Sequence, residues 1–234
     1  MPTKNIFGAV ALGLLSLGAS AADYSIDVQN LTRGSYFTPL LVAAHPDSAQ
    51  LFEAGQPADS ALQVMAEGGD ISQLEGAVQA AGGITVANPA GGLLAPGMTT
   101  TASFSNTDNM ASSQLSIVGM ILPSNDGFVG LGNLTLPTEA GTYVYELNAY
   151  DAGTEGNDEI RGSGAAGMPG MPVPPPLDPL MGTNGTGINA AAEGFVHIHR
   201  GVLGDLDATG GTSDIDASQS RWLNPVARIT VTVN

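Results

Sequence analysis

The residues best suited to chemistry lie in one acidic stretch, YDAGTEGNDE, at Tyr150–Glu159. It combines four carboxylates with the amide of Asn157, and Gly153 and Gly156 let its backbone turn sharply. Calcium takes roughly six to eight oxygen ligands of these kinds. We therefore expect a loop that can hold a hard cation such as calcium. The alternative is a plain acidic surface turn, because Asp, Asn and Gly dominate turns in general.

Histidine offers a second kind of chemistry. His197 and His199 lie two residues apart in Gly194–Val202, which we expect to be a strand, so both side chains should point to the same face. Together with His45 they could form a three-nitrogen site for zinc or copper. The alternative is a pair of polar side chains on the solvent face of a sheet.

Catalytic patterns are weak, and we predict that the protein is not an enzyme. The chain has no cysteine and no Gly-x-Ser-x-Gly elbow. A cation in the acidic stretch would keep its carboxylates ionised, so they could not act as general acids. Met168, Met171 and Met181 could offer soft ligands to copper(I), although such residues more often pack along a loop.

The candidate residues need strands to position them. Alternating or continuous apolar runs predict strands at Tyr24–Leu31, Phe37–Ala44, Thr99–Ser105, Leu115–Leu122, Phe128–Leu131, Thr142–Ala149, Gly194–Val202 and Val226–Val233. Apolar residues at helical spacing predict helices at Pro57–Gly68 and Ile71–Ala81. Short strands separated by turn residues favour an all-β, antiparallel β-sandwich, with the helical pair packed over one end.

Composition narrows the class of protein. The chain has 234 residues, with 22 Asp and Glu against 6 Lys and Arg, and a formal net charge of −16. This length suits one sizeable β domain. The negative charge would repel phosphate backbones, so we expect no nucleic-acid partner. Only 12 % of residues are charged, which suits an extracellular β protein better than a cytosolic enzyme. The partner that we expect for such a protein is an extracellular protein or glycan.

The N-terminal residues predict export. Met1–Ala21 combines Lys4, an apolar run too short to span a bilayer, and Ala19-Ser20-Ala21, which fits a cleavage site. We expect a cleaved signal peptide and a secreted or periplasmic protein without a membrane span. Residues 22–234 should then form a single domain. Within it, residues 161–189 are rich in Gly, Pro and Met and predict a long exposed loop.

The order of four sequence blocks resembles the spondin amino-terminal domain, which F-spondin, mindin and many bacterial secreted proteins share. The blocks are YSIDVQNLTRGSYFTPLLVAAH, MILPSNDGFVGL, YDAGTEGNDE and WLNPVARITV, and the resemblance runs from about Tyr24 to Val233. PSNDGFVG and DAGTE are its strongest parts. Two departures are the absence of cysteine and Gly127 in place of an aromatic residue, and both weaken any inference of animal-type receptor binding.

The resemblance implies a jelly-roll β-sandwich with one bound calcium ion, used in adhesion to a cell surface or matrix. Matching the family's acidic positions to this chain gives Asp126, Asp151 and Glu155 as the implied calcium ligands. Glu155 keeps the charge of the family's second aspartate but has a longer side chain. The first hypothesis is therefore a secreted, calcium-binding partner-binding module. The alternative is a transition-metal-binding protein that uses His45, His197 and His199.

Overall fold

The computed structural model describes residues 23–105 and 113–234, so the predicted signal peptide at Met1–Ala21 lies outside the described residues. The strands are β1 (Tyr24–Asn30), β2 (Tyr36–Phe37), β3 (Leu41–His45), β4 (Ile84–Ala87), β5 (Thr99–Phe104), β6 (Gln114–Leu122), β7 (Gly127–Thr135), β8 (Gly141–Asp151), β9 (His197–Ile198) and β10 (Ala227–Val233). The helices are α1 (Ser60–Gly68), α2 (Ser72–Ala80), α3 (Ala217–Ser220) and the 3₁₀ helix η2 (Asp178–Leu180).

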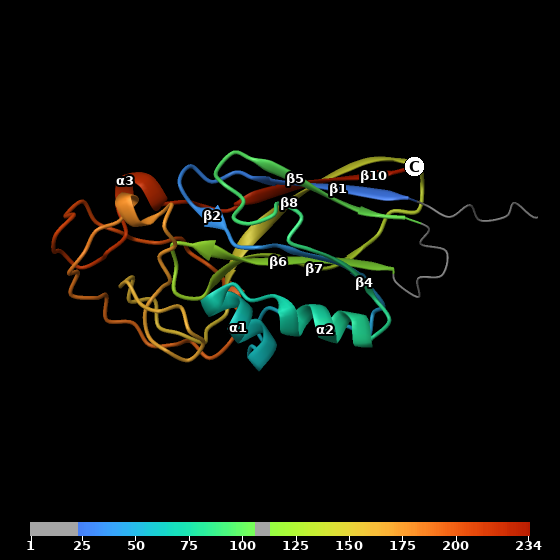
Figure 1. Cartoon of the computed structure of the whole chain (residues 1–234). Helices are drawn as coiled ribbons and strands as arrows, with labels where there is room; N and C mark the ends of the chain where they lie inside the picture. Colours follow the sequence, from blue (N-terminus) through green and yellow to red (C-terminus); the bar gives the residue numbers. More distant parts are fainter. Residues whose placement is uncertain (1–22, 106–112) are drawn as a thin grey trace, which may run out of the picture.

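The strands form an antiparallel β-sandwich, which confirms the predicted all-β fold. Their order is β4-β3-β6-β7-β8-β10-β1-β5, with β2 beside β6 and β9 beside β8. The path folds into two facing layers, with β5, β1 and β10 in one and β6, β7 and β4 in the other (Figure 1). Strand β8 joins the layers, because its first part pairs with β10 and its last four residues pair with β7.

The main core fills the space between the layers. Strand β1 alternates buried and half-buried residues, with Ile26 and Val28 fully buried, as its sequence pattern predicts. Strand β6 is buried on both faces, as its continuous apolar run predicts. Ile117 of β6 packs in the main core, whereas Val118 packs in a second cluster under the helices.

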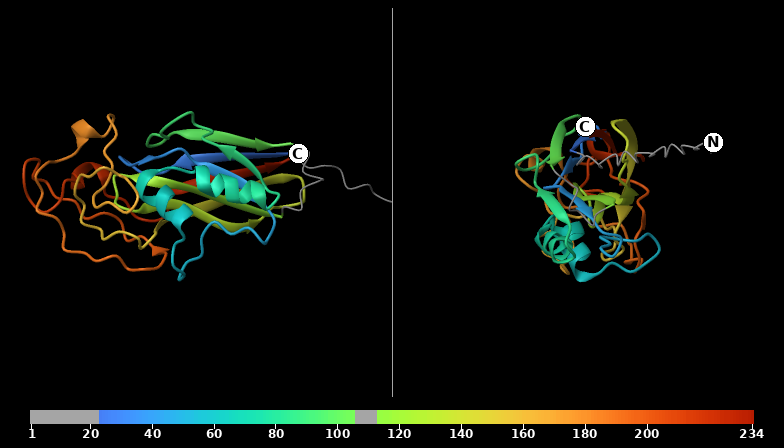
Figure 2. Two further views of the ribbon diagram at one scale, coloured as in Figure 1. Left: turned by 60° about the horizontal axis from the view of Figure 1, so that its bottom comes forward. Right: turned by 90° about the vertical axis from the view of Figure 1, so that its right-hand side faces the viewer.

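Helices α1 and α2 cover the outer face of the layer that contains β3, β6 and β7 (Figures 1 and 2). Leu62 and Met65 of α1 pack there against Val118 and Phe128. The expected position over one end of the sandwich is therefore wrong, because the second apolar face of β6 needs a cover. The helix also begins later than expected, since the Asp59 side chain caps it by accepting the Leu62 N–H at 2.8 Å.

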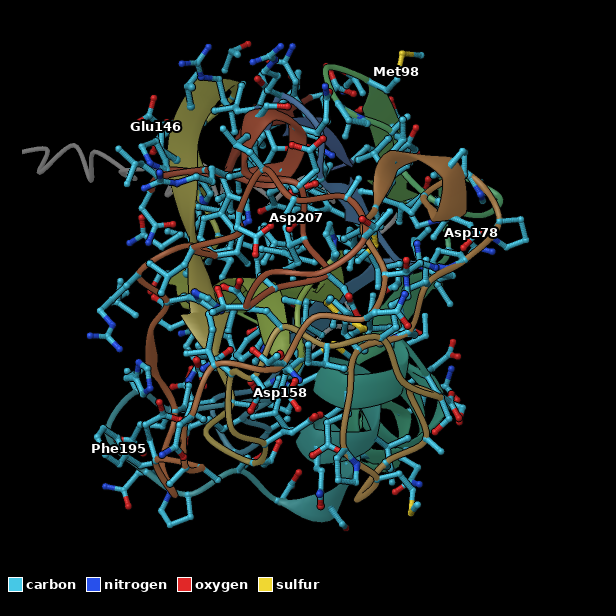
Figure 3. The ribbon with its side chains drawn as sticks, turned by 90° about the vertical axis from the view of Figure 1, so that its left-hand side faces the viewer. Met98, Glu146, Asp158, Asp178, Phe195 and Asp207 are labelled. Carbon is cyan, nitrogen blue, oxygen red and sulfur yellow. The ribbon has the colours of Figure 1, made fainter. Side chains whose placement is uncertain are left out.

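The loops that follow β8 gather at one end of the sandwich, opposite the C-terminus (Figure 1). The predicted strand Gly194–Val202 shortens there to β9, since Gly194 (φ 82°) and Gly201 (φ 90°) on either side of it do not have strand geometry. Beyond it, the backbone N–H groups of Leu203 and Gly204 bond the Glu159 carboxylate. Figure 3 looks onto this end, where Asp158, Phe195 and Asp207 come from three parts of the loops.

Residues 161–189 are mostly irregular, but they are not the fully exposed loop that their composition predicts. Met171, Leu177 and Met181 are buried in a third cluster with Met120 and Leu122 from the end of β6. The burial of Met171 and Met181 favours packing over copper binding for these methionines. None of the helices in the described part of the chain is long and apolar enough to cross a membrane.

Candidate metal centre

The candidate site lies where two loops meet at the end of the sandwich. The PSND turn (Pro123–Gly127) joins β6 to β7, and the acidic loop (Tyr150–Glu159) follows β8. Gly127 pairs with Asp151 in the β7–β8 ladder, and the Ala152 N–H donates to the Asp126 carbonyl at 3.2 Å. The ladder therefore places the two loops side by side.

Asn125 fastens the two loops together through its amide. Its Oδ1 accepts the Glu159 N–H at 3.0 Å. Its Nδ2 donates to Glu155 Oε1 at 2.8 Å and to Asp158 Oδ1 at 2.9 Å. Three residues of the acidic loop are thus held by one side chain of the PSND turn.

Asp126 is fully buried and only partly satisfied. Its Oδ2 accepts the backbone N–H groups of Thr154 at 2.8 Å and Glu155 at 3.0 Å. Its Oδ1 is buried and has no hydrogen-bond partner among the described residues. Burial, and then repulsion from Asp151, raise the pKa of Asp126 to about 7. A carboxylate in this position needs a cation or a proton beside its free oxygen.

Asp151 is also buried, and it faces both histidines of the His-x-His pair. Strand β9 places His197 directly opposite Asp151, and the His199 N–H donates to the Ala149 carbonyl at 3.0 Å. The Nε2 atom of His197 lies 3.7 Å from Asp151 Oδ1, and that of His199 lies 3.8 Å from Oδ2. The prediction that the two imidazoles share a face is confirmed, but this face lines the site rather than open solvent.

The hydrogen bonds of the two rings assign different tautomers. His197 Nδ1 lies 3.1 Å from the Ile198 carbonyl oxygen, so in the neutral ring this nitrogen carries the proton and Nε2 carries a lone pair. His199 Nδ1 accepts the Gly201 N–H at 3.0 Å, so the proton of the neutral ring is on Nε2. Burial lowers the pKa of His199 to about 4, although the negative charge of Asp151 acts in the opposite direction. The lowered pKa keeps the His199 ring neutral.

A cavity of about 440 Å³ opens beside these side chains, lined by residues that include Asp151, Glu193, His197 and His199. Glu193 Oε1 lies 3.9 Å from His197 Nε2. One ligand atom from each of Asp151, Glu193 and His197 lies within 4.8 Å of the other two. The site therefore gathers carboxylate oxygen and imidazole nitrogen around one space.

Two residues expected in metal sites lie elsewhere. Glu155 Oε1 is held by Asn125 and by the Gly170 N–H at 2.5 Å, and Glu155 lines a different cavity with Glu67. His45 pairs with Gln114 at the far end of β6, and its Nε2 lies 2.8 Å from Ser116 Oγ. At about 3.3 Å per residue, the length of β6 separates His45 from the site.

The donors present fit a hard cation in part. Asp126 brings a carboxylate from the PSND turn and Asp151 brings one from the end of β8. The free Asp126 Oδ1 is the atom that a cation would satisfy. Asn157, expected as an oxygen ligand, donates through Nδ2 to Asp151 Oδ2 at 2.7 Å. Glu193 was not predicted, because a glutamate four residues before a histidine signals proximity only in a helix.

Comparison with protein families matches residues 23–165 to the spondin N-terminal family, Spondin_N. This match includes the PSND turn and the acidic loop, whereas Glu193 and the histidine pair lie beyond it. A comparison with curated proteins found no match. The family match covers more than half of the chain and agrees with the β-sandwich and with the order of the sequence blocks, so the chain belongs to the spondin N-terminal domain family.

Proposed function

We propose that the protein is a non-enzymatic, extracellular partner-binding module whose loop end is held in place by a calcium ion bound to Asp126 and Asp151. Its family supports an extracellular-type module. The observation that carries the calcium proposal is the fully buried Asp126, whose Oδ1 has no hydrogen-bond partner among the described residues and which lies beside a second buried carboxylate.

The physical reason is the cost of two neighbouring buried carboxylates. Burial and mutual repulsion both disfavour the charged form of Asp126. A divalent cation between the two groups would reverse both effects, and calcium accepts oxygen ligands in flexible arrangements. Glu155 is turned toward Asn125 and Gly170, so we leave it outside the proposed ligand set.

Exposed apolar side chains support a partner-binding role for the loop end. The most exposed large apolar residues of the described chain belong to loops after β8: Leu203 is 59 % exposed, and Leu206 and Leu223 are each 80 % exposed. Contiguous exposed apolar patches mark interaction surfaces, and we propose that these three leucines contribute to one. The negative charge of the chain favours an extracellular protein or glycan over a nucleic acid as the partner.

The test is metal content and thermal unfolding of the purified protein before and after chelation. We expect one calcium ion per chain, and a melting temperature that chelation lowers and calcium restores. At a calcium concentration about 100 times Kd, binding should add about 2.7 kcal/mol to the free energy of unfolding.

The matched variants are Asp126→Asn at the site and Asp27→Asn on β1. Asp126→Asn should lose most of the calcium response, whereas Asp27→Asn should keep it. An Asp126→Asn protein that still gains the full calcium-dependent shift would contradict the proposed ligand set.

A further inference from the structure

We propose that Asp151, Glu193 and His197 bind a divalent transition metal ion of the zinc class, with one coordination position open to the cavity beside them. The site shares Asp151 with the proposed calcium site but does not depend on calcium binding. It also differs from the three-histidine site that the sequence suggested, because His45 is at the far end of β6.

The first argument is that three acceptor atoms face one another, of which Asp151 Oδ1 also accepts the Gly153 N–H at 2.8 Å. The Ile198 carbonyl holds the proton of His197 on Nδ1, so the Nε2 lone pair points toward Asp151 Oδ1 at 3.7 Å and Glu193 Oε1 at 3.9 Å. A backbone carbonyl bonded to the other ring nitrogen is the usual way in which a metal-binding histidine is oriented. Two carboxylates facing an imidazole lone pair repel it unless a cation or a proton lies between them.

The second argument is the lack of other partners. His197 Nε2 and Glu193 Oε2 are both buried atoms without a hydrogen-bond partner among the described residues. His199 is only 4 % exposed, and its Nε2 is also unpartnered and directed toward Asp151. Buried polar atoms are normally satisfied, so the unsatisfied atoms of His197 and Glu193 around one space point to an absent ligand.

The third argument is geometric. Zinc bonds nitrogen and oxygen at about 2.0–2.1 Å, so the ligand atoms of a tetrahedral ion lie about 3.3 Å apart. The observed separations of 3.7 and 3.9 Å between His197 Nε2 and the two carboxylates are only slightly longer. The ligand atoms of the two carboxylates lie within 4.8 Å of each other, so side-chain movements that bring Glu193 and Asp151 closer together would complete the coordination.

His199 acts in this arrangement as a positioning residue rather than a ligand. Because Gly201 donates to its Nδ1, its Nε2 carries the proton and points toward Asp151 Oδ2 at 3.8 Å. The other carboxylate oxygen, Oδ1, is then the one that faces His197. The same argument from tautomers that makes His197 a ligand excludes His199 as one.

The donor set favours a transition metal over calcium at this position. An imidazole nitrogen suits zinc and other transition metals, whereas calcium prefers oxygen alone. Three protein ligands leave a fourth position, and the adjoining cavity of about 440 Å³ gives water or a small molecule access to it.

The glycines of the acidic loop allow this site to form. Gly153 has φ +67°, and a Cβ there would lie 2.4 Å from the Phe195 carbonyl oxygen. The Gly194 N–H donates to the Gly153 carbonyl at 2.9 Å. This close contact holds the segment that carries Glu193 against the loop that follows Asp151.

The experiment is calorimetric titration of the chelator-treated protein with zinc chloride. We expect one zinc ion per chain. His197→Gln should weaken zinc binding by at least about 100-fold and Glu193→Gln by at least about 10-fold. Glu139→Gln makes the same charge change on an exposed side chain in the β7–β8 connection, so it should leave zinc binding unchanged.

Two readouts separate this proposal from the calcium proposal. ¹⁵N NMR of the imidazoles should show a zinc-dependent shift at His197 Nε2, with a smaller change at His199. His197→Gln should lose zinc binding and keep the calcium-dependent rise in melting temperature, and Asp126→Asn should do the reverse. The absence of zinc binding to the wild-type protein, or unchanged binding by folded His197→Gln and Glu193→Gln, would overturn the zinc site alone.

Discussion

At the scale of single residues, the carboxylates of this acidic protein divide into two groups. Some take the place of the backbone acceptors that a strand would provide. Glu159 accepts hydrogen bonds from the N–H groups of Leu203 at 2.6 Å and Gly204 at 2.8 Å, and from the Ser213 hydroxyl at 2.7 Å. Asp126, by contrast, keeps a buried oxygen without a partner among the described residues. The first group satisfies backbone donors that no strand satisfies, and the second has an oxygen that a cation or a proton would satisfy.

Glu159→Gln should measure the first role. Glutamine keeps the size of the side chain but removes the charge, and it directs an amide donor at groups that are themselves donors. Because hydrogen bonds to a charged group contribute about 1.5–3 kcal/mol each, we expect the free energy of unfolding to fall by about 2–3 kcal/mol. Urea denaturation measures this change. A loss below about 0.5 kcal/mol, the size expected for the exposed control Glu139→Gln, would show that the carboxylate does not hold the loops.

At the scale of elements, the site depends on how closely the acidic loop approaches the segment before β9. Gly153 contacts the backbone of Phe195, and Gly156 approaches Ala190 so closely that a Cβ would lie 2.5 Å from its carbonyl oxygen. This packing continues into the β8–β9 pair, where Asp151 and His197 are opposite each other. The short strand β9 thus has a positioning role that its two residues alone would not suggest.

Gly153→Ala should separate close packing from backbone strain. Gly91 is the matched control, because its φ of +69° is almost the same as the +67° of Gly153, but nothing lies within 4 Å of its Cβ position. Gly91→Ala should lower the free energy of unfolding by about 1–2 kcal/mol through the left-handed backbone alone. Gly153→Ala adds a clash with backbone, so we expect a larger loss in urea denaturation, together with weaker zinc binding. Equal losses for the two variants would argue against the close packing.

At the scale of the whole molecule, the sandwich separates stability from function. The core between the sheets and the cluster under α1 and α2 hold the strands, while the loops after β8 gather at one end (Figure 1). That end carries the candidate metal centre and the most exposed leucines. Under the calcium proposal, a partner bound there would contact loops that the ion helps to hold in place.

The double variant Leu206→Ser/Leu223→Ser tests the loop end as the binding surface. Both side chains are 80 % exposed, so the free energy of unfolding should change by less than about 1 kcal/mol. Adhesion of protein-coated beads to the surface or matrix of the producing cells should decrease severalfold. Val144→Ser is the control, since Val144 is 58 % exposed but belongs to β8. Equal adhesion of the double variant and the wild type would place the contact elsewhere.

Local patterns were enough to predict most of the framework. The alternation in Tyr24–Leu31 and the apolar run Leu115–Leu122 predicted β1 and β6 almost to the residue. The reason is that alternating apolar residues indicate a strand buried on one face, and a continuous apolar run indicates one buried on both. Strand β4 was missed, since Ile84–Ala87 is short and only half-buried or exposed. The helices α1 and α2 were predicted, but the face of the sheet that they cover was not. An apolar stripe along a helix does not show which surface it packs against.

The sequence by itself determined the family, the all-β class and the two loops in which Asp126 and Asp151 lie. Only the tertiary structure decided which ionisable side chains share a space. It turns Glu155 toward Asn125, leaves His45 at the far end of β6, and brings Glu193 and His197 to Asp151 from more than forty positions along the chain. The physical reason is that ligand geometry depends on strand pairing and on close backbone contacts between distant segments, which no local pattern of residues records.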